Sequence, residues 1–246
     1  MEENQDRDYC DNRQYHNVKT WPGKCSAFDQ SRDTHNIFIS VAGITASGKT
    51  SVTKALSKSL CVPSFHEPVL DNNYLRDFYR NPRRHGFAVQ VNLLNAHFQQ
   101  QQQIVWQGRG GIQDRSIYED LVYAKVLKDT GLMEEREYNT YTSLFNNLSN
   151  FLKRPNLIVY LDVTPEECKA RIDKRGCKGE SGITIEYLKC LQKGYEEFIT
   201  EMSRVLPVIR IKYKELHSTE DIANIVVRKY AEITSVWLID PEKFSR

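Results

Sequence analysis

The stretch Ile-Phe-Ile-Ser-Val-Ala-Gly-Ile-Thr-Ala-Ser-Gly-Lys-Thr-Ser spans residues 37–51 and joins an apolar run of strand length to a glycine-rich loop. The loop has the pattern Gly43-x-x-x-x-Gly48-Lys49-Thr50, and a helix-like segment follows it. Glycines at these positions let backbone N–H groups curl around an anion, and the helix N-terminus adds about half a positive charge. The stretch therefore predicts a nucleoside triphosphate site. Its predicted contact residues are Gly43, Thr45, Ala46, Ser47, Gly48, Lys49, Thr50 and Ser51.

Two side chains at the end of this loop have the chemistry that phosphates require. Lys49 can reach the outer phosphates of the triphosphate, and the Thr50 hydroxyl can ligate Mg²⁺. The alternative is a glycine-rich turn that binds nothing. A strand before the loop and a helix after it favour the phosphate site.

Composition limits the remaining possibilities. A chain of 246 residues suits one large α/β domain, and 34 basic against 32 acidic residues leave a net charge of +2, which predicts no nucleic-acid partner. No apolar run is long enough to span a membrane. The six cysteines are scattered without a C-x-x-C pattern, which favours free thiols, argues against a zinc site and indicates a reducing, cytoplasmic location.

The chain divides into a long central domain and two short extensions. Residues 1–35 form a polar N-terminal extension, residues 36–233 the domain, and residues 234–246 a C-terminal extension. Acidic residues outnumber basic ones in the first segment, which has no apolar stretch, so it resembles neither a transit peptide nor a secretory signal. It is either a disordered tail or, through its aromatic residues, a docking segment.

Strand-like and helix-like segments alternate along the domain. Strands are predicted at 37–41, 62–66, 110–113, 157–161 and 208–212, and helices at 49–60, 86–107, 116–129, 134–152, 164–174, 184–204 and 218–233. Such alternation predicts right-handed crossovers and a parallel sheet. The predicted fold is therefore α/β, with a central parallel five-stranded sheet flanked by helices in three layers. The glutamines at 99–103 are predicted to lie on a solvated or subunit-facing helix surface.

Polar residues follow the predicted strands where a parallel sheet binds its ligands. Glu67 follows the second strand and Asp114-Arg115 the third. Glu67 is a candidate general base for a hydroxyl nucleophile, with a helix cap or a surface charge as the alternative. Asp114 is a candidate acidic residue near Mg²⁺ and Arg115 a candidate cation, with an ordinary surface pair as the alternative.

Two further pairs share a helix face. Arg171 and Arg175 are four residues apart, and like charges at this spacing cost about 0.2–0.5 kcal/mol, so an anion such as a triphosphate under a lid is the favoured reason for them. A solvated basic face is the alternative. Gln90 and His97 are seven apart, and a Gln amide can pair with an adenine edge. A buried Gln bonded to the backbone is the competing interpretation.

Five linked motifs between about residue 37 and residue 215 resemble the deoxynucleoside kinases of the non-thymidine-kinase-1 type, especially their deoxyadenosine/deoxyguanosine kinase branch. The motifs are the phosphate loop, Glu67-Pro68-Val69, Tyr79-x-x-Pro82 with Phe87-x-x-Gln90, Asp114-Arg115-Ser116-x-Tyr118-x-Asp120, and Arg171-x-x-x-Arg175-Gly176-x-x-x-Glu180. The resemblance implies a P-loop kinase fold with a lid loop.

The resemblance also implies residue roles. Glu67 looks like the base that activates a 5′-hydroxyl, with Arg115 as its partner and Lys49 on the donor. Tyr79 and Glu180 look like the pair that holds the sugar 3′-hydroxyl. Further members of the predicted site are Gln90, His97 and Asp120 at the base, Arg171 and Arg175 on the donor phosphates, and Thr50 and Asp114 at Mg²⁺.

Three positions depart from the family pattern. Cys177 stands where many relatives have another lid arginine, for which Lys178 is a possible substitute. His97 stands where cytidine-accepting and guanosine-accepting members often have an arginine, which disfavours a pyrimidine substrate. The spacing after Asp120 is one residue shorter than in some relatives, so Tyr123 is assigned no role in stacking on the base.

The implied activity is transfer of the γ-phosphate of ATP to the 5′-hydroxyl of a deoxynucleoside in nucleotide salvage, with purines preferred and deoxyadenosine first. The implied assembly is a homodimer, with a tetramer as an option if the terminal extensions add an interface. A nucleoside monophosphate kinase of the thymidylate type is the alternative, and would need an extra cationic site. A regulatory GTP-binding switch is disfavoured, because the chain has no Asn-Lys-x-Asp motif.

Overall fold

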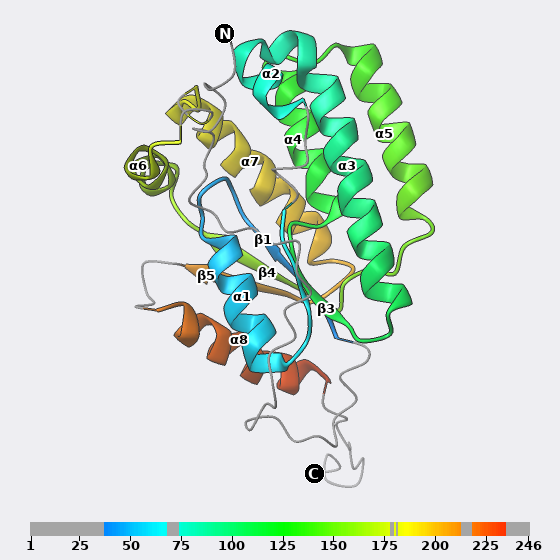
Figure 1. Ribbon diagram of the computed structural model, residues 1–246, viewed down its shortest axis with the longest axis vertical. Helices are drawn as coiled ribbons and strands as arrows, with labels where there is room; N and C mark the ends of the chain where they lie inside the picture. The colour runs from blue at the N-terminus through cyan, green and yellow to red at the C-terminus, as the bar shows by residue number, and fades with distance from the viewer. Residues whose placement is uncertain (1–36, 68–73, 178–179, 181, 213–217, 235–246) are drawn as a thin grey trace, which may run out of the picture.

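A parallel five-stranded sheet forms the centre of the molecule (Figure 1). The computed structural model describes residues 37–67, 74–177, 180, 182–212 and 218–234. The strands are β1 (Phe38–Ala42), β2 (Ser64–Phe65), β3 (Gly111–Asp114), β4 (Leu157–Asp162) and β5 (Val208–Lys212). Their order across the sheet is β2-β3-β1-β4-β5, and every pair is parallel. This confirms the predicted fold class.

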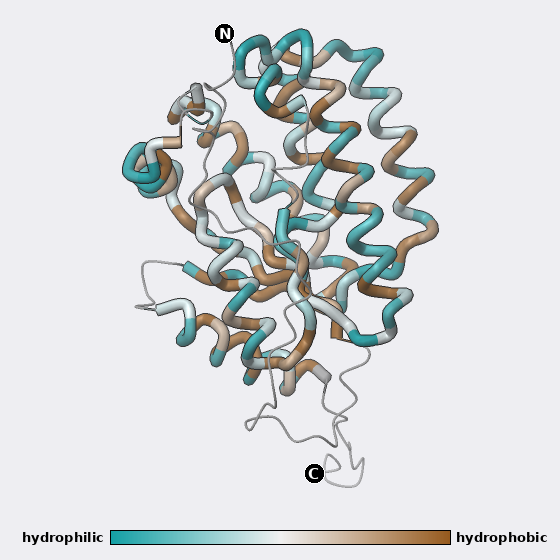
Figure 2. Tube along the Cα trace, in the orientation of Figure 1, coloured by the Kyte–Doolittle hydropathy of each residue, from teal (hydrophilic) through white to brown (hydrophobic). Residues whose placement is uncertain are grey.

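Helices cover both faces of the sheet (Figure 1). On one side α1 (Lys49–Leu60) packs against α8 (Thr219–Thr234). On the other side lie α3 (Pro82–Trp106), α4 (Ile117–Asp129), α5 (Glu135–Ser149) and α7 (Ile185–Met202). The two remaining described helices are α2 (Leu75–Arg80) and α6 (Pro165–Arg175). Figure 2 shows the strands mostly hydrophobic, while the surrounding helices alternate between hydrophobic and hydrophilic residues, so the core lies along the sheet.

The start of α3 differs from the prediction. The helix begins at Pro82, where Asn81 caps it by accepting a hydrogen bond from the Arg84 N–H, rather than at Gly86. Gly86 lies inside the helix, and a Cβ at this position would come within 2.9 Å of the Leu132 carbonyl oxygen. The glycine therefore marks a close approach of two segments, not a helix end.

Helix α2 was not predicted from the sequence. It is only six residues long and none of them is buried, so it has no apolar periodicity to reveal it. The remaining elements lie within a few residues of their predicted limits, as expected when helix ends fray.

The glutamine run near the end of α3 is only partly a surface. Gln99 and Gln103 are exposed, as predicted for a solvated or subunit-facing run. Gln100 and Gln101 point inward instead: their side-chain amides donate to the carbonyls of His66 at 2.7 Å and Lys153 at 2.9 Å. These two glutamines fasten α3 to the segments beside it.

The cysteine prediction holds for only part of the set. Cys168 and Cys190 are free thiols, and burial raises the pKa of Cys168 to about 11, which makes it unreactive. Cys61 and Cys177 are disulfide-bonded, so the expectation of free thiols is wrong for these two. Spacing along a chain cannot reveal pairings that depend on tertiary contact.

The predicted extensions fall mostly on residues 1–36 and 235–246, which lie outside the described residues. Within the described part of the chain, every helix is too short or too polar to cross a bilayer. The cytoplasmic location stays a prediction.

Candidate active site

A cavity of about 900 Å³ lies at the carboxyl edge of the sheet, where the phosphate loop, the end of β2 and the end of β3 meet. Parallel sheets bind ligands at this edge. Of the predicted site residues, those that line the cavity are Thr45, Ala46, Gly48, Lys49, Thr50, Ser51, Glu67, Tyr79, Gln90, Arg115, Arg171, Arg175 and Glu180. Residues from well-separated segments of the sequence thus converge on one space large enough for a small-molecule ligand.

The phosphate loop has the backbone that its glycines predict. Gly43 and Gly48 adopt φ values of 147° and 98°, a region that disfavours L side chains. A Cβ on Gly43 would also lie 2.7 Å from the Ser47 hydroxyl and 3.0 Å from the Leu161 carbonyl. Ser47 is buried, and its hydroxyl has no hydrogen-bond partner in the described part of the chain.

Lys49 lies inside the loop. Its ammonium donates to the carbonyl oxygens of Gly43 at 2.9 Å and Ile44 at 3.1 Å. Its direct hydrogen bonds among the described residues are to neutral carbonyls, while the Glu67 and Asp114 carboxylates act on its charge without bonding it, which leaves the ammonium available to an anionic ligand placed in the same loop.

Thr50 and Asp114 form a second polar pair beside the loop. The Thr50 hydroxyl donates to Asp114 Oδ2 at 2.6 Å, and the other carboxylate oxygen has no hydrogen-bond partner among the described residues. Burial raises the pKa of Asp114 although Lys49 opposes this effect. Among the described residues no group of three or more His, Cys, Asp or Glu side chains can hold a metal. The pair fits Mg²⁺ nevertheless, because this ion commonly keeps waters and substrate phosphates as most of its ligands.

Arg115 is the centre of a buried ionic network. Nη1 donates to the Glu67 carboxylate, and Nη2 donates to Asp120 Oδ1 at 3.1 Å. The same aspartate contacts His97 Nδ1 at 2.8 Å through Oδ2. Glu67 belongs to the cavity wall, whereas His97 and Asp120 are fully buried behind it. The structure thus brings these four predicted residues together, but only two of them line the cavity.

The network sets the charge on Glu67. Burial by itself would raise the pKa of Glu67, but the attraction of Arg115, followed by Lys49 and His97, outweighs it and lowers the pKa to about 2. Burial likewise opposes the charge of Arg115, and the Glu67 and Asp120 carboxylates nevertheless raise its pKa well above the ordinary value. Glu67 is therefore an ionised acceptor at any neutral pH.

Gln90 and Tyr79 come from α3 and α2, on the side of the cavity away from the phosphate loop. Gln90 is 3% exposed, and its side-chain oxygen has no hydrogen-bond partner among the described residues. An orphaned amide oxygen in a cavity wall indicates a ligand that donates a hydrogen bond there. Apolar neighbours in this half of the cavity are Leu75, Phe78, Val89, Leu93, Leu132 and Ile183.

The two predicted lid arginines have different partners. Arg171 donates through Nη1 to the Ser47 carbonyl at 3.1 Å and through Nη2 to Glu167 at 2.5 Å, which ties α6 to the phosphate loop. Arg175 forms an ion pair with Glu180 at 2.8 Å. Both arginines line the same cavity as the phosphate loop, which is the predicted triphosphate site.

Sequence reasoning assigned no role to several cavity residues, including Lys54, Tyr123 and Tyr187. It also missed Glu119, which is fully buried. Glu119 accepts hydrogen bonds from the Ser116 N–H at 3.2 Å and from the Tyr195 hydroxyl at 2.8 Å. The pattern Ser116-x-x-Glu119 is a capping box, so the sequence contained the signal for a helix start. It contained no signal for the burial of the Glu119 side chain.

Residues 39–235 match the family model described as deoxynucleoside kinase. The chain is 46% identical over 215 residues to deoxyadenosine kinase of Dictyostelium discoideum. The aligned part covers 87% of this chain and 88% of that protein. It is 35% identical to deoxyadenosine/deoxycytidine kinase of Bacillus subtilis (strain 168), covering 78% of this chain and 90% of that one. Its fold is similar to a solved deoxyadenosine kinase from M. mycoides with the products dCMP and dCDP bound, with a TM-score of 0.72, 28% identity, and coverage of 80% of this chain and 100% of that chain.

Glu119 predicts a pH dependence of stability. Burial raises its pKa from 4.5 to about 7. Between pH 4.5 and pH 7 Glu119 holds a proton in the folded protein that it releases in the unfolded chain. The stabilising effect of this proton is present at low pH and is lost as the pH rises through 7. Relative to Glu119→Gln, the wild-type free energy of unfolding should fall by about 2–3 kcal/mol between roughly pH 5 and pH 8. Urea titrations at several pH values measure this difference.

The matched control is Glu137, which occupies the same capping-box position in α5 but is only half-buried. Glu137→Gln should show no such pH-dependent difference from wild type. If the gap between wild type and Glu119→Gln is constant from pH 5 to pH 8, the buried carboxyl does not titrate as described.

Proposed function

This chain belongs to the deoxynucleoside kinase family, and from this membership we propose that it phosphorylates deoxyadenosine in preference to other deoxynucleosides, with ATP as the donor. As a member of the family it transfers a phosphoryl group from a nucleotide donor to a deoxynucleoside. The observation that carries the assignment of the reacting centre is that Glu67 lines the same cavity as the phosphate loop.

Glu67 is proposed to accept the proton of the 5′-hydroxyl. With a pKa of about 2 it is a weak base, but it is always ionised and it is fixed by Arg115. Phosphoryl transfer passes through a loose transition state in which the nucleophile has lost little of its proton, so orientation of the hydroxyl matters more than base strength. Charge spreading over the transferring group is then compensated by Lys49, Arg171 and Arg175.

Thr50 and Asp114 are proposed to hold Mg²⁺ together with the donor phosphates. The unpartnered Asp114 oxygen supports this proposal. The ion, when bound, would neutralise negative charge on the donor phosphates. Asp114 needs no third protein ligand for this role, since the phosphates and water supply the remaining oxygens.

Gln90 is proposed to read the base. Its free oxygen requires a donor, and its NH₂ group offers two. Adenine presents an amino donor next to a ring-nitrogen acceptor, which is the complement of an amide. His97 and Asp120, the other two predicted base readers, are held behind the wall by their contacts with each other and with Arg115. Their predicted role is therefore proposed to be indirect, and the remaining recognition groups at this end, Tyr79 and Glu180, are proposed to hold the sugar.

A nucleoside monophosphate kinase is the second candidate, and the site disfavours it. An acceptor phosphate would need a cation near Glu67, but Arg115 is already committed to two carboxylates. The ionised Glu67 would also repel the acceptor phosphate. Steady-state assays of deoxyadenosine against its monophosphate separate the two activities.

A homodimer is proposed through α3 and α5. Val91, Phe98 and Val105 recur every seven residues on α3 and are not fully buried. At the end of this stripe Trp106 is 76% exposed and, after α5, Phe151 is 85% exposed. Exposed apolar residues that extend a helical stripe are typical of an interface between subunits. If the terminal extensions take part in a tetramer, they would form a second interface in addition to this one.

Glu67→Gln should lower kcat by about 10²–10⁴-fold, because the amide cannot take the proton and pairs less well with Arg115. Since the pKa of Glu67 is about 2, the wild-type kcat/KM should show no acid limb from this residue in the range where the enzyme stays folded. The control is Glu186→Gln, which changes another cavity carboxylate with no assigned role. Its kcat should stay within about threefold of the wild-type value. Near-normal turnover of Glu67→Gln would remove the residue from its role.

Deoxyadenosine should give the highest kcat/KM when the four natural deoxynucleosides are compared at low concentration. Gln90→Leu should lower this value by about 5–150-fold, the loss expected for one bidentate base contact. Gln99→Leu, on the exposed face of the same helix, is the matched control. An unaltered preference in Gln90→Leu would show that another group reads the base.

Light scattering should give twice the chain mass of 28.7 kDa. Trp106→Glu should halve that mass, whereas Val205→Glu, which charges an exposed apolar residue away from α3 and α5, should not. A chain lacking residues 1–34 tests the tetramer, because an unchanged number of chains per assembly after the truncation refutes a contribution of that segment. A dimer that survives Trp106→Glu places the interface elsewhere.

A further inference from the structure

Arg115 reaches its partners from a strained backbone position. It lies between β3 and α4, directly before the cap Ser116, and its φ is 66°, a left-handed conformation that non-glycine residues adopt at a cost. Its backbone N–H donates to the Val41 carbonyl at 3.2 Å, which holds this turn against β1. The side chain then folds back over the first two turns of α4, where it meets Asp120 and Tyr123.

The guanidinium is hydrogen-bonded through its two terminal nitrogens and not through Nε. Nη1 and Nη2 have carboxylate partners, while Nε is buried without a hydrogen-bond partner among the described residues. Two bonds at one side of a planar group leave its tilt unset. The tilt is set by Tyr123, whose ring lies 3.9 Å from the guanidinium carbon. Stacking of Arg on an aromatic face fixes the plane of the fork and adds a cation–π attraction.

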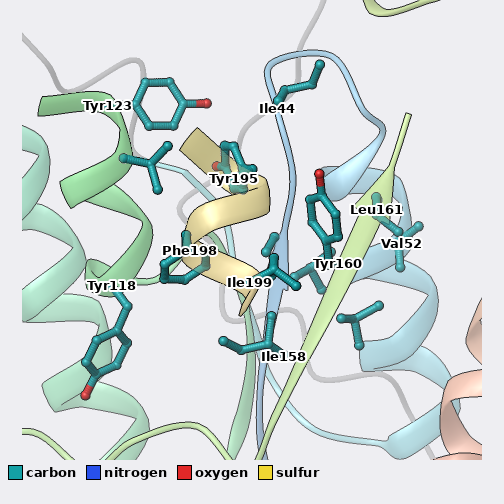
Figure 3. Packing of buried hydrophobic residues seen from close by; sticks show 14 of the residues in the cluster. Ile44, Val52, Tyr118, Tyr123, Ile158, Tyr160, Leu161, Tyr195, Phe198 and Ile199 are labelled. Carbon is teal, nitrogen blue, oxygen red and sulfur yellow. The ribbon is translucent and has the colours of Figure 1, made fainter. Parts of the chain in front are cut away.

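The ring of Tyr123 is itself held from behind. Tyr195 on α7 meets it edge-on with the ring centroids 6.2 Å apart, and Tyr195 stacks on Tyr160 of β4 at 5.9 Å (Figure 3). The Tyr195 hydroxyl donates to the buried Glu119 carboxylate. A column of three rings from three elements therefore supports one face of the guanidinium.

The Tyr123 hydroxyl makes a much weaker contact. It lies 3.4 Å from the Thr45 hydroxyl in the phosphate loop, near the limit of a hydrogen bond. The ring, rather than the hydroxyl, is therefore the part of Tyr123 that matters for Arg115.

We propose that Tyr123 is a positioning residue for the phosphoryl transfer: its ring sets the plane of Arg115 and so aims the Glu67 carboxylate at the acceptor hydroxyl. This role rests on the function proposed above. Tyr123 touches no reacting atom in the scheme and acts through the arginine. Its placement beneath the guanidinium explains why an aromatic residue two turns after the cap lies in the cavity wall without being needed to stack on a base.

The first test compares three variants by steady-state kinetics. Tyr123→Leu removes the aromatic face, and should lower kcat by about tenfold while KM for ATP changes less than about threefold. Tyr123→Phe keeps the face and should restore most of kcat. The matched control is Tyr118→Leu, a buried tyrosine of the same helix that packs on Phe145 and points away from Tyr123 (Figure 3). Equal losses in Tyr123→Leu and Tyr118→Leu, or no rescue by Phe, would overturn the proposal.

The second test is a double-mutant cycle with Arg115→Lys, which keeps the charge but has no planar fork. In this background Tyr123→Leu should lower kcat by no more than about twofold, because there is no fork left to orient. A full tenfold loss, additive with that of Arg115→Lys, would contradict the inference. Failure of the wild-type protein to phosphorylate any deoxynucleoside would instead refute the proposed function, so the two failures are distinguishable.

Discussion

The burial of one guanidinium is the constraint on which the site depends. Only 3% of the Arg115 side chain is exposed, and a cation in such a place is tolerated only when carboxylates compensate it. Glu67 comes from the end of β2 and Asp120 from α4, so compensation forces an edge of the sheet and a helix to converge. Loss of one partner of a buried pair costs about 3–5 kcal/mol, which makes this convergence a property of the fold as well as of the chemistry.

The same arrangement determines what Glu67 can do. A carboxylate tuned for strong general-base catalysis would have a pKa near neutrality. Arg115 moves the pKa of Glu67 in the opposite direction, to about 2. Glu67 is therefore a weak base, but its carboxylate is held in place and is always ionised. That choice suits phosphoryl transfer, in which placement and electrostatic compensation contribute more than covalent chemistry.

The sequence predicted those parts of the site that short local patterns encode. The phosphate loop could be predicted because it needs glycine at positions whose backbone angles are unfavourable for other residues. Gly43 and Gly48 have such angles. The positions of Glu67 and Arg115 follow from their place after strands in a parallel sheet. Helix α2 was invisible because it buries nothing, and Gly86 was misread because the neighbour it accommodates, Leu132, is distant in sequence. Glu119 was missed because its partner Tyr195 is distant in sequence, and Tyr123 was given no role because residue spacing does not show that its ring lies against Arg115.

The contact between His97 and Asp120 has a consequence for substrate choice. Both side chains are fully buried, and the aspartate divides its oxygens between the imidazole and Arg115. A carboxylate used in this way has little capacity left for a base in the cavity, and the imidazole lies behind the wall with it. The proposed reader of the base is Gln90, whose side-chain oxygen has no hydrogen-bond partner among the described residues. In this proposal the base meets an uncharged amide with apolar side chains beside it, and is selected by the hydrogen-bond pattern of that amide. On this view, the residues that stabilise Arg115 and those that select the base are separate, so that base preference can change without disturbing the ionised carboxylate at the reacting centre.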